Sequence, residues 1–146
     1  MHPRKQGDFG ELSAAMWLTT RGAVVSKPIG HSPDYDLIAD LGDRILRVEV
    51  KTCRRNSTTG RWAVAICTRG GNQSWSGMTK RFEPARCDYV FVHVGSGRRW
   101  FIPATAVEAE TCIALGGPKY AEFEVEPGEP LPSPTRRKGA STIVLP

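Results

Sequence analysis

An acid and an amine stand two residues apart inside one apolar segment of this sequence. The segment, residues 45–53, contains Glu49 and Lys51 on either side of Val50. Successive side chains of a β-strand point to opposite faces, so Glu49 and Lys51 share one face while apolar side chains line the other. A carboxylate can hold a metal ion, and an amine about 6.6 Å along the strand can reach a phosphate or water beside that ion. The spacing therefore allows metal-assisted hydrolysis, although any half-exposed antiparallel strand alternates in the same way.

Asp36 lies upstream of this segment, in a second short strand predicted over residues 35–40. A short connection that contains Gly joins the two strands, so the pair is predicted to form an antiparallel hairpin. Such a hairpin would bring Asp36 close to Glu49. Asp34 lies in the turn before the strand. An acid that caps a turn is the alternative reading of Asp36.

Glu11 supplies a third acid, on a helix predicted over residues 8–20. Apolar residues recur on this helix at close to the 3.6-residue spacing of a buried stripe. Glu11 falls at the edge of the stripe, so its side chain is expected to point partly into a cleft. The alternative is an acid that only stabilises the helix N-terminus through the helix dipole. The predicted stripe consists of Phe9, Leu12, Ala15, Met16 and Thr19.

The order of these motifs resembles the PD-(D/E)xK nuclease superfamily. Gly10-Glu11 on a first helix is followed by Pro33-Asp34-Tyr35-Asp36 and then by Glu49-Val50-Lys51, within residues 5–53. Within that superfamily, the pattern is most similar to the small enzymes that include group I intron homing endonucleases and archaeal Holliday-junction resolvases. The later segments 87–94 and 100–103 resemble the late hairpin of such homing enzymes.

The resemblance implies an α/β fold, with α+β as the alternative, in which helices flank a central mixed β-sheet of the restriction-endonuclease type. It also implies a Mg-dependent endodeoxyribonuclease that hydrolyses phosphodiester bonds, with Glu11, Asp36, Glu49 and Lys51 as catalytic residues. Asp36, Glu49 and the Val50 main-chain carbonyl would hold Mg²⁺, or Mn²⁺ in its place, with Glu11 as a further candidate ligand. The proline-acid pair of the superfamily lies at Pro33-Asp34, so Asp34 competes with Asp36 for the ligand role; we choose Asp36 because it falls within the strand pattern. Lys51 would orient or activate the attacking water.

Basic residues exceed acidic residues in the sequence, 20 against 15, which gives a formal net charge of +5. A modest excess of this kind is typical of a protein that approaches a polyanion. Several basic or polar residues fall at predicted strand ends and loops, where their side chains can reach phosphates. A solvated basic surface is the alternative. The candidate DNA-binding residues are Lys5, Arg54, Arg55, Arg69, Gln73, Lys80 and Arg81.

The chain length suits one domain with a single core, and residues 1–126 are expected to form that nuclease domain. Residues 127–146 are rich in Pro, Gly and Ser and contain a basic run, which predicts a tail that is disordered or loosely docked. Three further sheet strands and a short helix complete the expected domain. The strands are predicted at residues 61–67, 88–94 and 99–102, and the helix at residues 104–110.

No apolar run approaches the length of a membrane span, and the first residues lack the apolar segment of a signal peptide, so a cytoplasmic location is expected. The four cysteines are widely spaced without nearby paired histidines, which indicates neither a zinc site nor a disulfide framework. The expected partner is double-stranded DNA. A homodimer or homotetramer is expected, because one constellation cuts one strand at a time. A homing-type double-strand endonuclease is preferred over a Holliday-junction resolvase-like nuclease or a noncatalytic DNA-binding module.

Overall fold

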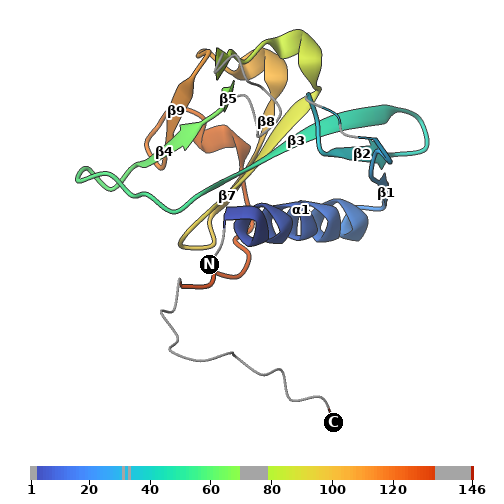
Figure 1. The fold of residues 1–146 in the computed structure, drawn as a ribbon, viewed down its shortest axis with the longest axis horizontal. Helices are drawn as coiled ribbons and strands as arrows, with labels where there is room; N and C mark the ends of the chain where they lie inside the picture. The colour runs from blue at the N-terminus through green and yellow to red at the C-terminus, as the bar shows by residue number, and fades with distance from the viewer. Residues whose placement is uncertain (1–2, 31, 33, 70–78, 134–145) are drawn as a thin grey trace.

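The structure is a computed structural model that describes residues 3–30, 32, 34–69, 79–133 and 146, apart from the side chains of Thr68, Arg69 and Thr79. Within these ranges the helix α1 (Pro3–Thr20) covers one face of a six-stranded sheet, and a small two-stranded sheet covers the other (Figure 1). The six strands follow the order β1 (Val24–Ser26), β2 (Leu37–Asp40), β3 (Ile45–Cys53), β7 (Tyr89–Val94), β8 (Arg99–Pro103) and β10 (Glu124–Val125).

The strand β3 lies inside the central sheet and has a neighbour of each kind. It pairs antiparallel with β2, where Leu37 lies opposite Val48, and parallel with β7, where Glu49 lies opposite Val90. The other pairings of this sheet are antiparallel. The sheet is therefore mixed, which confirms the predicted α/β class and the restriction-endonuclease-like architecture.

The two faces of β3 differ as its alternating sequence predicts. Leu46 and Val48 are buried in the core beneath α1, together with residues of β2 and β7. Glu49 and Lys51 point to the opposite face, where Cys53 joins a second core. The strand thus separates an apolar layer from the polar side chains that could do chemistry.

The second core lies between the central sheet and the pair β4 (Trp62–Ala65) and β9 (Cys112–Leu115). We expected residues 61–67 to join the central sheet, and that expectation is wrong because β4 pairs antiparallel with β9. Trp62 and Val64 alternate with exposed alanines, so the strand has one apolar face, which suits an outer layer. A further small pairing joins β5 (Thr68–Arg69) and β6 (Thr79–Lys80).

The buried face of α1 differs from the predicted stripe. Leu12 and Met16 are each 71% exposed, and the buried positions are instead Gly10, Ala14, Trp17 and Leu18. The helix also begins at Pro3 rather than at Asp8.

The reason is how closely α1 approaches β3. A Cβ atom at Gly10 would overlap Thr52 Cγ2 and would lie 3.3 Å from Val50 Cγ1. Small residues therefore mark the face that touches the sheet, while the larger Leu12 and Met16 point outward.

The predicted helix at residues 104–110 is a short 3₁₀ turn, η2 (Ala104–Ala106), so that expectation is wrong. The β-branched residues Thr105 and Val107 favour helix weakly, and the chain continues in extended form toward β9. The predicted strands at 88–94 and 99–102 correspond to β7 and β8. The other 3₁₀ turns are η1 (Pro84–Arg86) and η3 (Ala121–Phe123).

The buried His93 ties the segment after residue 126 to the domain. Its Nδ1 lies 2.7 Å from Ser13 Oγ on α1, and its Nε2 lies 2.7 Å from the carbonyl oxygen of Glu129. A carbonyl can only accept, so Nε2–H donates to it and the Ser13 hydroxyl donates to Nδ1. Leu131 is also buried. The described start of the segment predicted as a loosely docked tail thus contacts β7 directly and is linked to α1 through His93.

In the described part of the chain, no helix combines the length and the apolar character that a membrane crossing requires.

Candidate active site

Asp36 sits where the pairing of β2 with β3 ends. Its backbone N–H donates to the Val48 carbonyl at 2.9 Å, and its side-chain Oδ2 accepts from the Val50 N–H at 2.8 Å. The carboxylate oxygen therefore accepts the hydrogen bond that a backbone carbonyl of β2 would accept if the strand pairing continued. Polar groups of alternate residues of a strand face the same neighbour, so the Val50 carbonyl is directed to this open edge as well. The Asp36 carboxylate and the Val50 carbonyl therefore face the same open edge.

Glu49 and Lys51 form an ion pair on the opposite face of β3 from α1. The Lys51 Nζ lies 2.8 Å from the Glu49 Oε1, and their side chains are only 19% and 13% exposed. The two-residue spacing predicted that they share a face, and the contact follows from it. The mostly buried Lys51 ammonium is thereby held beside the Glu49 carboxylate, next to the open edge.

Burial and mutual repulsion make these acids costly to ionise. Burial raises the pKa of Asp36, the negative charge of Glu11 raises it further, and the Val50 hydrogen bond and Lys51 oppose the rise. Burial likewise raises the pKa of Glu49, against the attraction of Lys51 and with added repulsion from Asp36. A cation that binds beside two carboxylates which repel each other stabilises the ionised form of both.

Glu11 reaches this cluster from α1. It follows Gly10, whose close contact with β3 fixes the height of the helix above the sheet. The Glu11 side chain is partly buried, and its Oε2 lies 2.6 Å from the Nζ of Lys27, just beyond β1. The predicted orientation at the edge of a cleft is correct, although the buried stripe that suggested it lies elsewhere on the helix.

The two competing acids, Asp34 and Asp36, have different partners. Asp34 Oδ1 lies 2.7 Å from Lys80 Nζ and 3.9 Å from Arg86 Nη1. Asp36 instead bonds to the backbone of β3, beside Glu49. After burial, the main cause, both acids raise the pKa of Glu49, Asp36 more strongly than Asp34. Asp34 is also the acid that pairs with two basic side chains.

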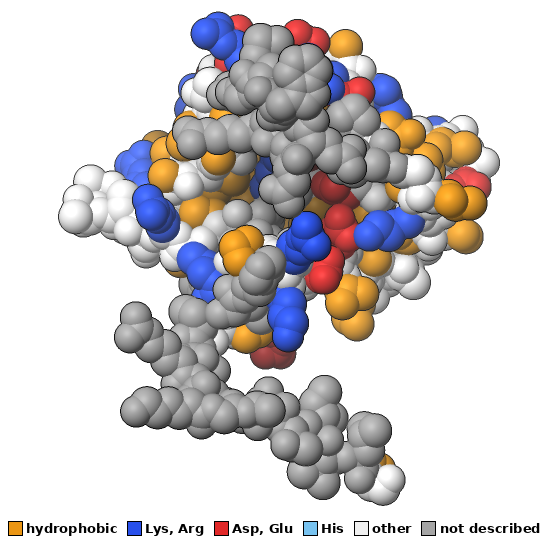
Figure 2. Space-filling model, viewed as in Figure 1, with side chains coloured by type: hydrophobic (Ala, Val, Ile, Leu, Met, Phe, Trp, Pro, Cys, Tyr) orange, Lys and Arg blue, Asp and Glu red, His pale blue; other side chains and the backbone are white. Residues whose placement is uncertain are grey.

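Acidic side chains gather near the middle of one face of the molecule, with Lys and Arg side chains beside them (Figure 2). Several of the candidate DNA-binding residues are engaged within the chain. Arg54 donates to the side chain of Gln6 and to the Pro132 carbonyl, Lys80 pairs with Asp34, and Arg81 pairs with Glu110 at 2.9 Å.

The remaining candidates are less constrained or less fully described. Lys5 and Arg55 are exposed. The backbone of Arg69 forms part of β5, its side chain is not described, and Gln73 lies outside the described residues.

Lys27 is the residue of this cluster that sequence reasoning missed. It follows a strand of three residues, β1, which is too short for a periodicity to show. The pair Val24-Val25 followed by Lys27-Pro28 was the available signal, since a residue before proline favours extended backbone.

The family model of the PD-(D/E)XK endonucleases matches residues 1–117. The chain belongs to this family. This PD-(D/E)XK endonuclease is also similar in structure to a bacterial homing endonuclease, I-Ssp6803I, with a TM-score of 0.73 and 20% sequence identity over 85% of this chain and 89% of that one. At that identity the likeness concerns the fold. A search of curated proteins finds no match.

The donors of the PD-(D/E)XK endonuclease suit a hard divalent cation. Nucleases of this family generally use divalent metal ions. Asp36, Glu49 and the Val50 carbonyl offer oxygen atoms, and Mg²⁺ is commonly held by one or two carboxylates together with water and substrate phosphate. Among the described residues, no group of three His, Cys, Asp or Glu side chains is arranged to hold a metal ion. Glu11 is held by Lys27 rather than grouped with the other two acids.

Proposed function

We propose that this endonuclease is a Mg²⁺-dependent enzyme that hydrolyses phosphodiester bonds of double-stranded DNA and acts as a homing-type double-strand endonuclease. The observation that carries the proposal is the meeting of Asp36, Glu49 and Lys51 at the point where β2 leaves β3. A carboxylate pair and an adjacent ammonium at one open edge of a sheet are the groups that metal-assisted phosphodiester hydrolysis needs.

Each residue has a distinct role in this proposal. Asp36, Glu49 and the Val50 carbonyl hold Mg²⁺, or Mn²⁺, which when bound supplies positive charge to the phosphate oxygens and lowers the pKa of a bound water. Lys51 orients the attacking water and stabilises negative charge in the transition state. Glu11 acts at the outer edge of the cluster. The products are a 5′-phosphate and a 3′-hydroxyl.

DNA is proposed to approach over the open edge, so that basic side chains contact its backbone. Lys5, Arg54, Arg55, Arg69, Gln73, Lys80 and Arg81 remain the proposed contacts. Lys80 is paired with Asp34, so a phosphate must compete with a carboxylate for this ammonium, which lowers the contribution of this contact to DNA affinity.

The test is incubation of the full chain with Mg²⁺ and three DNA substrates: linear duplex, supercoiled plasmid and a four-way junction. Cleavage of linear and supercoiled duplex that EDTA abolishes is expected. Strong preference for the four-way junction would assign the alternative, a resolvase-like nuclease. Binding of duplex without cleavage in Mg²⁺ or Mn²⁺ would overturn the catalytic proposal in favour of a noncatalytic DNA-binding module.

Two sites are needed to cut both strands in one encounter, so the proposed enzyme is a homodimer or homotetramer. Its proposed location is the cytoplasm. Light scattering of the free protein and of its DNA complex measures this directly. A particle that stays monomeric in both states, and that converts supercoiled plasmid only to nicked circles, would contradict the oligomer and indicate a nickase.

A further inference from the structure

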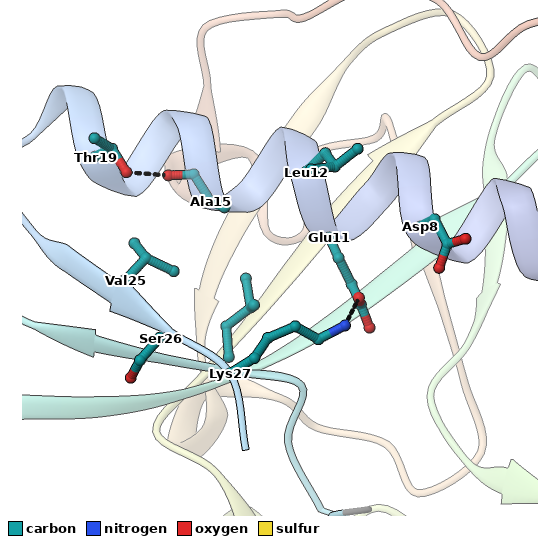
Figure 3. Close-up of a pocket in the computed structure, with 9 residues that line it drawn as sticks. Asp8, Glu11, Leu12, Ala15, Thr19, Val25, Ser26 and Lys27 are labelled. Carbon is teal, nitrogen blue, oxygen red and sulfur yellow. Dashed lines mark hydrogen bonds and ion pairs between the residues drawn. The ribbon is translucent and has the colours of Figure 1, made fainter. Parts of the chain in front are cut away.

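Lys27 places a second ammonium at the cluster, on the side away from Lys51. Its Nζ lies 2.6 Å from Glu11 Oε2, although its side chain is 60% exposed. Figure 3 shows the side chain extended from the end of β1 toward the Glu11 carboxylate on α1. The two residues also line the same two grooves, one of about 700 Å³ beside Leu12 and Val25 and one of about 400 Å³ that includes Asp36.

The local sequence fixes this placement. Lys27 precedes Pro28, and the residue before a proline is kept out of helical conformation, so the chain continues outward in the direction of β1. Gly10 lets α1 pack close to β3, and Glu11 is the next residue of that helix. The Lys27 ammonium and the Glu11 carboxylate therefore meet for two reasons. Pro28 keeps the chain after β1 extended, and Gly10 lets α1 pack close to β3.

The charge at this point bridges acids from two elements. The Lys27 ammonium interacts first with Glu11 and also with Asp36 and Asp8, and these acids raise its pKa. Glu11 and Asp36 in turn repel one another. A cation between a carboxylate of the helix and a carboxylate of the sheet serves the electrostatic purpose that a second divalent ion would serve.

We propose that Lys27 acts as a built-in substitute for a second metal ion: its ammonium occupies Glu11 and so limits the site to one divalent ion, at Asp36 and Glu49. This inference rests on the proposed function and specifies its metal requirement. Lys27 is a positioning residue in this scheme, because it acts through Glu11 and the charge balance. Cleavage by the natural chain then depends on the first power of the Mg²⁺ concentration.

The test compares divalent-ion stoichiometry in variants of Lys27 and of its partner Glu11. Mn²⁺ is titrated calorimetrically into the full chain and into Lys27→Met, Lys27→Arg, and the double variant Lys27→Met with Glu11→Gln. About one ion per chain is expected for the natural protein and for Lys27→Arg, which keeps the charge. Lys27→Met should bind about two ions, and the double variant about one, because the added ion needs the Glu11 carboxylate.

Lys119→Met is the matched control. Lys119 also forms a 2.8 Å ion pair with a glutamate, Glu108, and is 57% exposed, but it lies outside the cluster. It should bind about one ion, as the natural chain does. Thermal melting of each variant shows that it is folded, and the exposure of Lys27 makes its replacement by Met tolerable.

Failure of this inference is distinguishable from failure of the proposed function. If the natural chain binds one ion and cleaves DNA but Lys27→Met also binds one, the metal-substitute role is overturned and the nuclease stands. Weaker DNA binding by Lys27→Met with unchanged stoichiometry would make Lys27 a phosphate contact instead, which also overturns the inference. If the natural chain binds one ion and Lys27→Met binds a second that Glu11→Gln removes, yet neither protein cleaves DNA, the inference holds and the proposed function fails. Absence of ion binding in every variant overturns both.

Discussion

The carboxylate of Asp36 accepts a hydrogen bond from the backbone N–H of Val50 at 2.8 Å, at the place where β2 no longer supplies a backbone carbonyl. One side chain therefore completes the edge of the ladder and presents an acidic oxygen beside Glu49. An amide oxygen in its place could accept the same bond but would bind a hard cation poorly. Fold and chemistry at this position can be separated by a single substitution.

We predict that Asp36→Asn and Glu49→Gln each abolish cleavage and weaken Mg²⁺ or Mn²⁺ binding, with thermal stability largely retained because the amides keep the shape and the acceptor atom. Calorimetric titration and a plasmid cleavage assay measure both effects. Asp34→Asn is the matched control and should matter less, because Asp34 is paired with Lys80. The reverse ranking would show that Asp34 is the ligand.

Lys51→Ala is predicted to reduce cleavage by at least about 100-fold, since an ammonium that stabilises transition-state charge is lost. DNA affinity should stay within a few-fold of the natural value, because one phosphate contact among several contributes little. Single-turnover cleavage and a binding assay without metal separate the two quantities. Undiminished cleavage by this variant would remove Lys51 from the active site.

Gly10→Ala is predicted to destabilise the fold by about 1–3 kcal/mol, because the added methyl group overlaps the stiff, β-branched side chain of Thr52. Cleavage should fall as well, since α1 must move and Glu11 moves with it. Gly7→Ala is the control on the same helix: its added Cβ meets nothing within 4 Å, so it should stabilise by about 0.5–1 kcal/mol. Urea unfolding measures both. Equal stability of the two variants would refute the close-contact explanation.

The pH dependence of stability follows from the raised pKa values of Asp36 and Glu49. A raised pKa in the folded state gives stability that is fully present below the unfolded-state pKa, about 4, and is lost as pH rises through the folded-state pKa. Without metal, this contribution therefore decreases as the pH rises above about 4. Mg²⁺ requires the ionised acids, so it should raise the melting temperature at pH 7 and hardly at pH 4.

The double variant Asp36→Asn with Glu49→Gln tests this explanation. It should melt at least as high as the natural chain at pH 7 without metal, and it should not respond to Mg²⁺. Differential scanning calorimetry at both pH values gives the comparison. An equal response to Mg²⁺ in the natural chain and the double variant would locate the bound ion elsewhere.

The parts of the fold that could be predicted are those that depend only on residues close together in the sequence. The alternation of β3 puts Glu49 and Lys51 on one face whatever the neighbours are, and the connection to β2 is too short for anything but antiparallel pairing. The order of Glu11, Asp36 and Glu49 with Lys51 then indicated the family, which the family model confirms.

The parts that could not be predicted depend on long-range packing. The outward position of Leu12 and Met16 follows from the contact of Gly10 with Thr52, a residue far along the chain. The sequence of β4 has one apolar face, but it does not reveal that this face covers the central sheet from outside. Lys27 was missed for the same reason, because its partner Glu11 is brought to it only by the docking of α1.

The parallel pairing of β3 with β7 bears on how the protein is made in the cell. The strand that carries Glu49 and Lys51 is followed by β4, β5 and β6 before its second neighbour, residues 89–94, is synthesised. Pairing over such a separation is slow, because a long loop must close before its contacts form. A ribosome-bound chain that stops before β7 leaves β3 without this neighbour and the core beneath α1 without Phe91. The strand that carries the candidate site is therefore completed only after residues 89–94 have been synthesised.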